Sequence, residues 1–324
     1  MNAITRAVHS ADGLQQRRPM LAFPVAVWKK FGDDQAGYLA ALISYYGFAA
    51  LFPLLLVLVT VLNIVLKNDP TLRSSLLNSA LAQYPVIGPQ LIKPSTSISG
   101  TGLPLVFGIV LLLLGARGVA GAMQNALCEV WGIARKDRPS FPLNQLSGLG
   151  LVLTVGLGFI ATTFLSGVAG GAGHLLTGVA AHIGTVVVSL VLNVGVFWAS
   201  FRIATVGRVR WRDLRTGAII AAAVWQLLQF VGGYVVTHQL NRASDLYGTF
   251  GLVLGLLAWL YLQAEVTLYA AEIDVVLTKR LWPRSIIDDA AAPGDERAVP
   301  DDAPSAGPAE AAGRTAGDNK PARR

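Results

Sequence analysis

Long stretches without charged residues divide the chain into candidate membrane-spanning segments. Long intervals that lack Asp, Glu, Lys and Arg include residues 35–66, 94–116, 139–201, 216–241 and 246–264. A bilayer-spanning helix needs about 20 mostly apolar residues, so the third interval, with 63 residues, holds two spans. Its glycine-rich sequence Ala169–His174 predicts the turn between them. The pattern therefore predicts six membrane helices.

The fold class that follows is all-α, a polytopic bundle of six transmembrane helices. We expect the spans near Tyr38–Val65, Leu103–Ala122, Gln145–Leu165, Val179–Phe201, Thr216–His238 and Gly248–Leu277. The chain then divides into an amino-terminal segment (residues 1–37), a membrane domain (38–280) and a carboxyl-terminal tail (281–324).

The segments outside the spans carry their own patterns. The amino-terminal segment predicts a short interfacial helix with Phe23, Val27, Trp28 and Phe31 on its apolar side. Asp69-Pro70 resembles a helix start, and leucines at helical spacing follow it, so an amphipathic helix is expected in the first outer loop. The tail is rich in Ala, Gly and Pro and is expected to be disordered.

The positions of the basic residues predict the topology. The amino-terminal segment, the second and fourth connections and the segment after the last span (residues 278–324) hold 21 Lys and Arg, whereas the alternate connections hold 4. Basic residues accumulate on the cytoplasmic side of membrane proteins, so both termini are expected in the cytoplasm. The net charge of +7 then indicates contact with anionic membrane lipids, and we expect no nucleic acid partner. A homo-oligomer is an open alternative.

The residues needed for metal, disulfide or catalytic chemistry are sparse. Cys128 is the only cysteine, and the four histidines are scattered. The sequence has no G-x-S-x-G motif, no P-loop and no dinucleotide-binding motif. We therefore expect no metal, no cofactor and no enzymatic activity.

The last predicted span carries acidic residues on a face of small residues. Gly248, Gly251 and Gly255 share one helical stripe with Glu265 and Glu272. Small residues let membrane helices approach closely, so both carboxyl groups should face protein. An ionisable residue inside a span is a candidate functional group. The alternative is that the two glutamates only lock the bundle.

Two further spans hold polar or helix-bending residues. Arg117 lies in the second span beside Gln124 and Asn125, at about the depth of Glu265, and it could bind a lipid headgroup or pair with Glu265 or Glu129. In the first span Pro53 predicts a kink. Tyr45 and Tyr46, two turns earlier, are either core aromatics or part of a polar path.

Three blocks of sequence carry a family resemblance. They are DDQAGYLAALISYY (residues 33–46) with LFP (51–53), ALCEVWGI (126–133) with Arg138-Pro139, and LYGTF (246–250) with WLY (259–261). These blocks resemble the YihY/BrkB family of bacterial inner-membrane proteins. Ala270-Ala271-Glu272 stands where that family usually has Gly-Ala-Glu.

The resemblance implies six spans with both termini in the cytoplasm of a bacterial inner membrane. It also implies a role in envelope integrity, with links to serum resistance in pathogens and to lipid or lipopolysaccharide transport. Members once carried the label ribonuclease BN, which the scattered histidines of this chain do not favour. The leading hypothesis is therefore an envelope protein that moves or shields a lipid-like substrate. The alternative is an ion-coupled exporter in which Glu265 titrates.

The 21-to-4 distribution of basic residues gives a direct test of topology. Reporter domains fused to either terminus should be active in the cytoplasm, and a reporter inserted beside Lys93 should be active outside it. A cytoplasmic signal from the Lys93 fusion would contradict the six-span arrangement.

Overall fold

The computed structural model describes residues 12, 15–16, 19–65, 103–138, 142–171, 179–285 and 292–298. This part of the chain is helical and contains no strand. Its α-helices are α2 (Pro19–Asp33), α3 (Ala36–Val65), α6 (Leu103–Val130), α7 (Leu143–Gly171), α8 (Val179–Ala204), α9 (Arg215–Lys279) and α10 (Pro293–Ala298). Two short 3-10 helices, η1 (Arg135–Asp137) and η2 (Trp211–Leu214), lie in connections. The helix expected after Asp69 lies outside the described residues.

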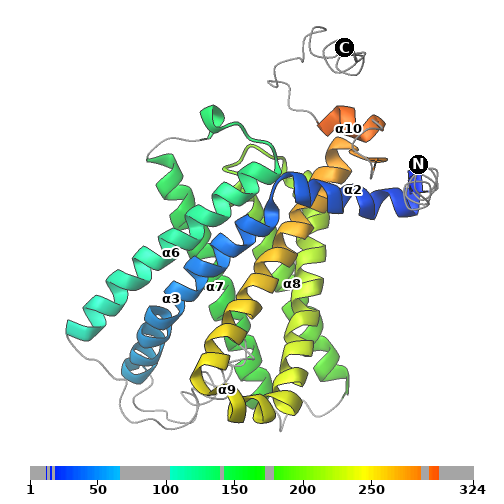
Figure 1. Cartoon of the computed structure of the whole chain (residues 1–324). Coiled ribbons are helices and arrows are strands. Elements are labelled where there is room, and N and C mark those ends of the chain that lie inside the picture. The colour runs from blue at the N-terminus through cyan, green and yellow to red at the C-terminus, as the bar shows by residue number, and fades with distance from the viewer. Residues whose placement is uncertain are drawn as a thin grey trace, which may run out of the picture.

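Five helical segments within these ranges are long and apolar enough to cross a membrane. They are Val106–Val130, Leu143–Thr162, Ile183–Ala204, Trp211–Gly232 and Val253–Lys279. The last two both lie in the 65-residue helix α9, whose chain reverses direction between them (Figure 1). We name them the first and second limbs of α9. In α3 the apolar helix Ala36–Leu51 is shorter than these five segments. The sixth span therefore stays a prediction.

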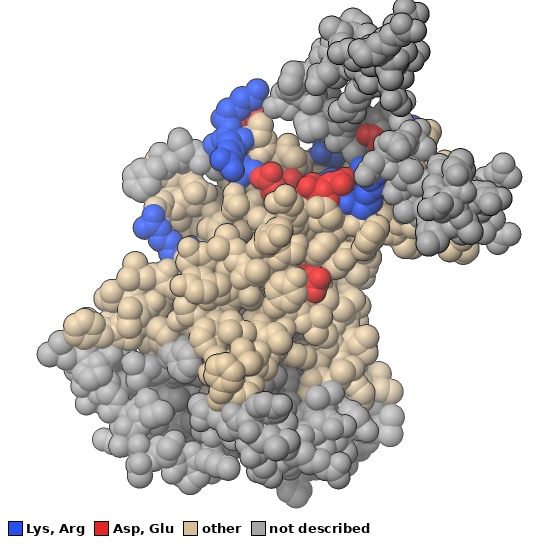
Figure 2. Space-filling model, in the orientation of Figure 1, with Lys and Arg blue, Asp and Glu red and all other residues tan. Residues whose placement is uncertain are grey.

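The helices pack as an elongated bundle with a charged end. In Figure 1 α6 and α3 lie beside each other on one flank, α8 and α9 on the other, and α2 crosses the end near α10. Figure 2 shows most of the Lys, Arg, Asp and Glu side chains of this face at that same end, with isolated basic and acidic groups nearer the middle of the bundle. The charged end, as we call it, carries α2, η1, η2 and α10.

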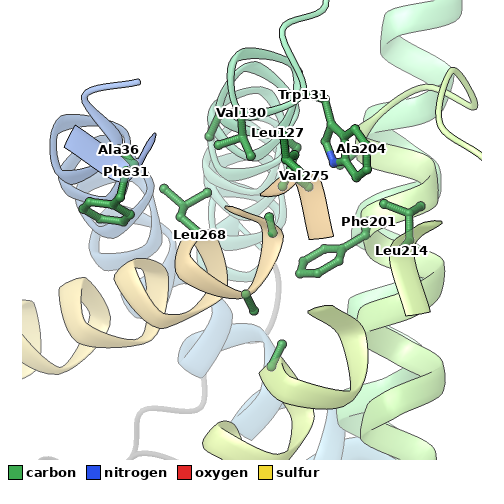
Figure 3. Packing of buried hydrophobic residues seen from close by; sticks show 14 of the residues in the cluster. Phe31, Ala36, Leu127, Val130, Trp131, Phe201, Ala204, Leu214, Leu268 and Val275 are labelled. Atoms are coloured by element: carbon green, nitrogen blue, oxygen red, sulfur yellow. The ribbon is translucent and has the colours of Figure 1, made fainter. Parts of the chain in front are cut away.

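The buried core is concentrated next to the charged end. Figure 3 shows Leu127 and Val130 of α6 meeting Leu268 and Val275 of α9, with Phe201 of α8 beside them. All five side chains are fully buried. By contrast, only 6–33% of each candidate span is buried within the chain, which is expected where helices face lipid. The charged end is therefore where the helices are held together.

Close contact between α3 and α6 depends on two glycines. A Cβ atom at Gly115 would lie 2.8 Å from the Cβ of Ala50 and 2.9 Å from its Cα. A Cβ at Gly118 would overlap the ring of Tyr46. Small residues at such crossings allow backbones to approach. The sequence predicted such close packing of small residues in the last span and not between the first two spans.

The predicted small-residue stripe of the last span is only partly in contact with protein. Gly251 and Gly255 are half-buried and Ala258 is exposed, whereas Gly248 lies in the part of α9 whose side chains are not described. Pro53 lies inside α3, which continues beyond it to Val65 and is bent along its length (Figure 1).

Helix α2 confirms the expected amino-terminal helix but corrects its orientation. Ala26, Val27 and Phe31 are buried against the bundle, whereas Trp28 is 65% exposed and Met20 is 90% exposed. Trp28 therefore lies on a second apolar side that faces away from the protein.

The expectation of disorder from residue 281 onward is wrong for the part of the tail nearest the bundle. Leu281 and Ser285 are fully buried, and Arg284 pairs with Asp33 of α2 and with Asp295 of α10. Burial alone would raise the pKa of Asp295, but hydrogen bonds from the Ser285 N–H, Arg284 and the Ala292 N–H hold it below its usual range. Apolar packing of Leu281 and Trp282 on the core and these charged and polar contacts together dock this segment. Residues 299–324 lie outside the described part.

The α3–α6 crossing predicts a strong effect of one added methyl group. Gly115→Ala should destabilise the protein by about 1–3 kcal/mol, because the new Cβ meets backbone atoms that cannot rotate away. Thermal unfolding of the detergent-purified protein measures this. Gly156→Ala on α7 is the matched control, since a Cβ there has no neighbour within 4 Å. Equal midpoints for the two variants would contradict the close crossing.

Candidate functional site

A cluster of buried charges joins α2 to the second limb of α9. The Lys30 ammonium donates a hydrogen bond to Asp34 and another, of 3.2 Å, to the carbonyl oxygen of Val130. Its Nζ also lies 3.6 Å from Oε2 of Glu272. Glu272 is fully buried and Lys30 is 8% exposed. One ammonium therefore connects α2, the end of α6 and the last membrane helix.

Local backbone geometry places these groups. Asp34 lies one helical turn after Lys30, since its backbone N–H donates to the Lys30 carbonyl oxygen at 3.0 Å, and the chain then turns toward α3 through Gln35, which has a positive φ of 52°. The end of α6 presents free carbonyl groups and the negative end of its dipole, a natural site for cations. Lys279 donates to the neighbouring Trp131 carbonyl oxygen at 3.1 Å. Two lysines, from α2 and α9, therefore cap α6.

The cluster has more acidic than basic groups. Lys30 is the one cation that contacts Asp34 and Glu272 among the ion pairs of the described residues. Burial raises the pKa of Asp34 above its ordinary value, and the attraction of Lys30 opposes this shift only in part. Burying an ion pair costs desolvation energy. Lys30 therefore mainly offsets the cost of burying these carboxyl groups and adds little net stability to the fold.

A second buried carboxylate stabilises the packing of the two limbs of α9. Asp274 accepts a hydrogen bond of 2.7 Å from the backbone N–H of Gly217, in the first turn of α9. A carboxylate at a helix start is favourable because free N–H groups and the helix dipole meet there. A Cβ at Gly217 would lie 2.4 Å from the carbonyl oxygen of Ala270. Asp274 therefore has a structural role.

A polar cleft lies between α6 and α7 near the charged end. Its volume is about 110 Å³. It is lined by Gly121, Gln124, Asn125, Cys128, Arg138, Asn144 and Val206. The sequence placed Gln124 and Asn125 near Arg117, and the structure brings both of them to this cleft.

The lining of the cleft is organised around Arg138. Its Nη1 donates to Oδ1 of Asn125 at 2.6 Å, its Nη2 to Glu129 at 2.7 Å, and its Nε to the carbonyl oxygen of Ile133 at 3.1 Å. Gln124 is only 4% exposed, and its Nε2 has no hydrogen-bond partner in the described part of the chain. The cleft thus combines a fixed guanidinium with an unused amide donor.

The other predicted site residues lie outside the charge cluster and do not line the cleft. Arg117 is exposed on α6 and Glu265 is half-buried on α9. No ion pair joins them among the described residues, although they lie at similar depths. Tyr46 packs against Gly118, and Tyr45 is 63% exposed. The expected pairing of Glu265 with Arg117 is not formed, because Arg117 points away from the bundle.

Sequence reasoning missed several residues of the two sites. Lys30 and Asp34 are four residues apart near a helix end, which is a recognised spacing for an ion pair. Arg138 was noted only as part of a sequence block, and Asn144 and Asp274 were not singled out. Their roles depend on contacts between elements far apart in sequence, which no local pattern reveals.

The chemistry available at the cleft is hydrogen-bond donation to a polar group. Within the described ranges, no three His, Cys, Asp or Glu residues gather in a way that could hold a metal ion. The cleft offers amide groups and a guanidinium that already pairs with a carboxylate. This set suits an acceptor-rich ligand of low net charge.

A family model and several known proteins match most of this chain. The model of the family described as Virulence factor BrkB matches residues 27–294. The chain is 23% identical to the inner membrane protein YhjD of Escherichia coli K12, over 79% of this chain and 81% of that protein. It is 25% identical to the ribonuclease-like protein YfkH of Bacillus subtilis, over 74% of this chain and 90% of that protein.

A longer relative and the solved structures complete the comparison. A UPF0761 membrane protein of Pelodictyon phaeoclathratiforme is 26% identical over 78% of this chain. That match covers only 59% of the relative's own length. No solved structure matches the chain.

The buried charge cluster predicts an asymmetric response to substitution. Lys30→Met should lower stability by about 3–5 kcal/mol, because it leaves the buried Glu272 carboxyl without its cation. Adding Glu272→Gln to Lys30→Met should recover part of that loss. Thermal unfolding of both variants and of Glu272→Gln alone measures the coupling.

The control for this cycle is the more exposed pair of Arg138 with Glu129, whose side chain is 48% exposed. Glu129→Gln should change stability by about 1 kcal/mol or less. A Lys30→Met variant as stable as the native protein would show that the cluster does not hold α2.

Proposed function

Because this chain belongs to the Virulence factor BrkB family, we propose that it moves or shields a lipid-like molecule between the leaflets of the bacterial inner membrane. In this proposal it is a multi-pass protein that maintains the cell envelope and acts on membrane lipids rather than on nucleic acid. We propose no enzymatic activity for it. The charged end faces the cytoplasm, as the basic residues of its connections favour.

A polar stripe on the outer face of α6 carries the proposal. Arg117, Gly121, Asn125 and Glu129 are all exposed and recur every four residues, so they lie along one side of the helix. The first part of the helix is different, because Phe107, Leu111 and other large apolar side chains are exposed there. The stripe therefore leads from the membrane interior toward the charged end.

Arg117 is the residue of this stripe that is least suited to an ordinary lipid contact. It lies thirteen residues before the end of α6 at Val130, or about 20 Å along the helix axis. Inserting an arginine at such a depth in the membrane costs about 2.5–3.5 kcal/mol of free energy. A phosphate group that pairs with the guanidinium offsets this cost. Lipid headgroups that travel along α6 would supply that partner.

The ion-coupled exporter remains the second candidate. Glu265 supports it, because this carboxyl group is half-buried on a membrane helix, one turn from Tyr261 and one turn from Tyr269. An exporter would need a water-filled path centred on Glu265. The cleft between α6 and α7 is lined by other residues and favours the lipid proposal.

A lipid movement assay tests the proposed function. Purified protein is placed in vesicles that contain a fluorescent phospholipid, and an impermeant quencher reports how fast the label changes leaflet. The native protein should accelerate exchange, and Arg117→Gln should slow it about tenfold because a charged hydrogen bond is lost.

The matched control for that assay is Arg212→Gln, which removes another exposed arginine, on η2 and away from the stripe. It should leave the exchange rate unchanged. Native protein that exchanges lipid no faster than empty vesicles would overturn the lipid-movement proposal.

A further inference from the structure

We propose that the cleft beside Gln124 binds a phosphate group, and that it is the headgroup site of the lipid-like substrate. This inference rests on the proposed function and assigns particular atoms to it. The ligand chemistry is a phosphate ester or a free phosphate, and the test below separates these two sources.

The first observation is the unused donor of Gln124. The side chain is 4% exposed, lines the cleft, and its Nε2 has no partner in the described part of the chain. Buried amide donors in native proteins are nearly always paired. A ligand oxygen in the cleft would complete the hydrogen bonding of this group.

The facing helix approaches this amide through a glycine. On α7, a Cβ at Gly148 would lie 3.8 Å from Nε2 of Gln124 and 4.0 Å from its Oε1. A larger side chain at Gly148 would therefore fill the space around the amide. Glycine at this position lets α7 pack directly against the amide, on a side that does not belong to the lining of the cleft.

The second observation is the character of the lining. Asn125, Asn144 and Arg138 add further donors, and no carboxylate lines the cleft. Glu129 balances the Arg138 charge through the 2.7 Å ion pair. Such a site favours a group with many acceptor oxygens and a single negative charge, which describes a phosphodiester. Arg117, one turn beyond Gly121, provides a second cation on the same side of α6.

The size and depth of the cleft agree with a headgroup. Its volume of about 110 Å³ corresponds to about four waters at ~30 Å³ each, which is enough for a phosphate but not for an acyl chain. Gln124 lies six residues before the end of α6, or about 9 Å along the axis. This is close to the boundary between acyl chains and headgroups. The chains of a bound lipid would then remain in the membrane beside α6.

Binding measurements on the full chain test the site directly. In one arm, native mass spectrometry measures how much phosphatidylglycerol the detergent-purified protein retains. In the other arm, calorimetry measures the binding of inorganic phosphate. Gln124→Leu removes the donor, and Gln124→Glu keeps the size of the side chain but places a negative charge there.

Gln263→Leu is the matched control. Gln263 is also buried, at 8% exposure, and its Nε2 is also unpaired, but it lies on α9 and does not line the cleft. Both Gln124 variants should reduce phosphate-group binding about tenfold, whereas Gln263→Leu should bind as the native protein does. If Gln124→Leu fails to accumulate in membranes, Gln124→Glu alone decides the result.

The outcomes are distinct. Retention of phosphatidylglycerol that depends on Gln124, without binding of inorganic phosphate, supports the lipid source, and equal dependence in both arms supports a general phosphate site. Binding that is unchanged in folded Gln124 variants overturns the site, even if the vesicle assay supports lipid movement. Binding that depends on Gln124 in a protein that moves no lipid supports the site and contradicts the proposed function.

Discussion

Three segments that are far apart in sequence meet at the Lys30 ammonium, and each contributes one group that contacts it. Asp34 comes from the turn after α2, the Val130 carbonyl from the end of α6, and Glu272 from the last membrane helix. Because a buried carboxylate without a cation is very unfavourable, α2 cannot leave this position without exposing or protonating Glu272. Helix α2 is thereby fixed to the bundle, and the core beside Leu127 and Leu268 forms next to it.

Most of the predicted helices are confirmed, because few backbone conformations are possible inside a bilayer. Without water, a spanning segment must satisfy its own backbone hydrogen bonds, so long charge-free stretches become helices. The boundaries were less predictable. Helix α6 was expected to end at Ala122 but continues to Val130, because polar side chains such as Gln124 face a cleft inside the protein rather than lipid.

The candidate site was only partly predictable, for a geometric reason. The sequence gives the depth of a residue in its span, so Arg117 and Glu265 looked like partners. It does not give the rotation of each helix, and packing at Gly115 and Gly118 turns Arg117 outward. Glu272 was identified as a candidate, but its partner Lys30 lies outside the predicted spans. Contacts between distant elements, rather than composition, define both polar features.

The exposed side of α6 connects the fold to the proposed activity. Its polar stripe leads to the cleft, on a side of α6 that is not packed against α3 or the buried core. The central claim is that a lipid phosphate occupies this cleft, and a high-resolution structure in phospholipid nanodiscs tests it most directly. The account predicts headgroup density within hydrogen-bonding distance of the Gln124 amide. Density for acyl chains alone along Arg117 and Asn125, with the cleft closed by side chains, would contradict it.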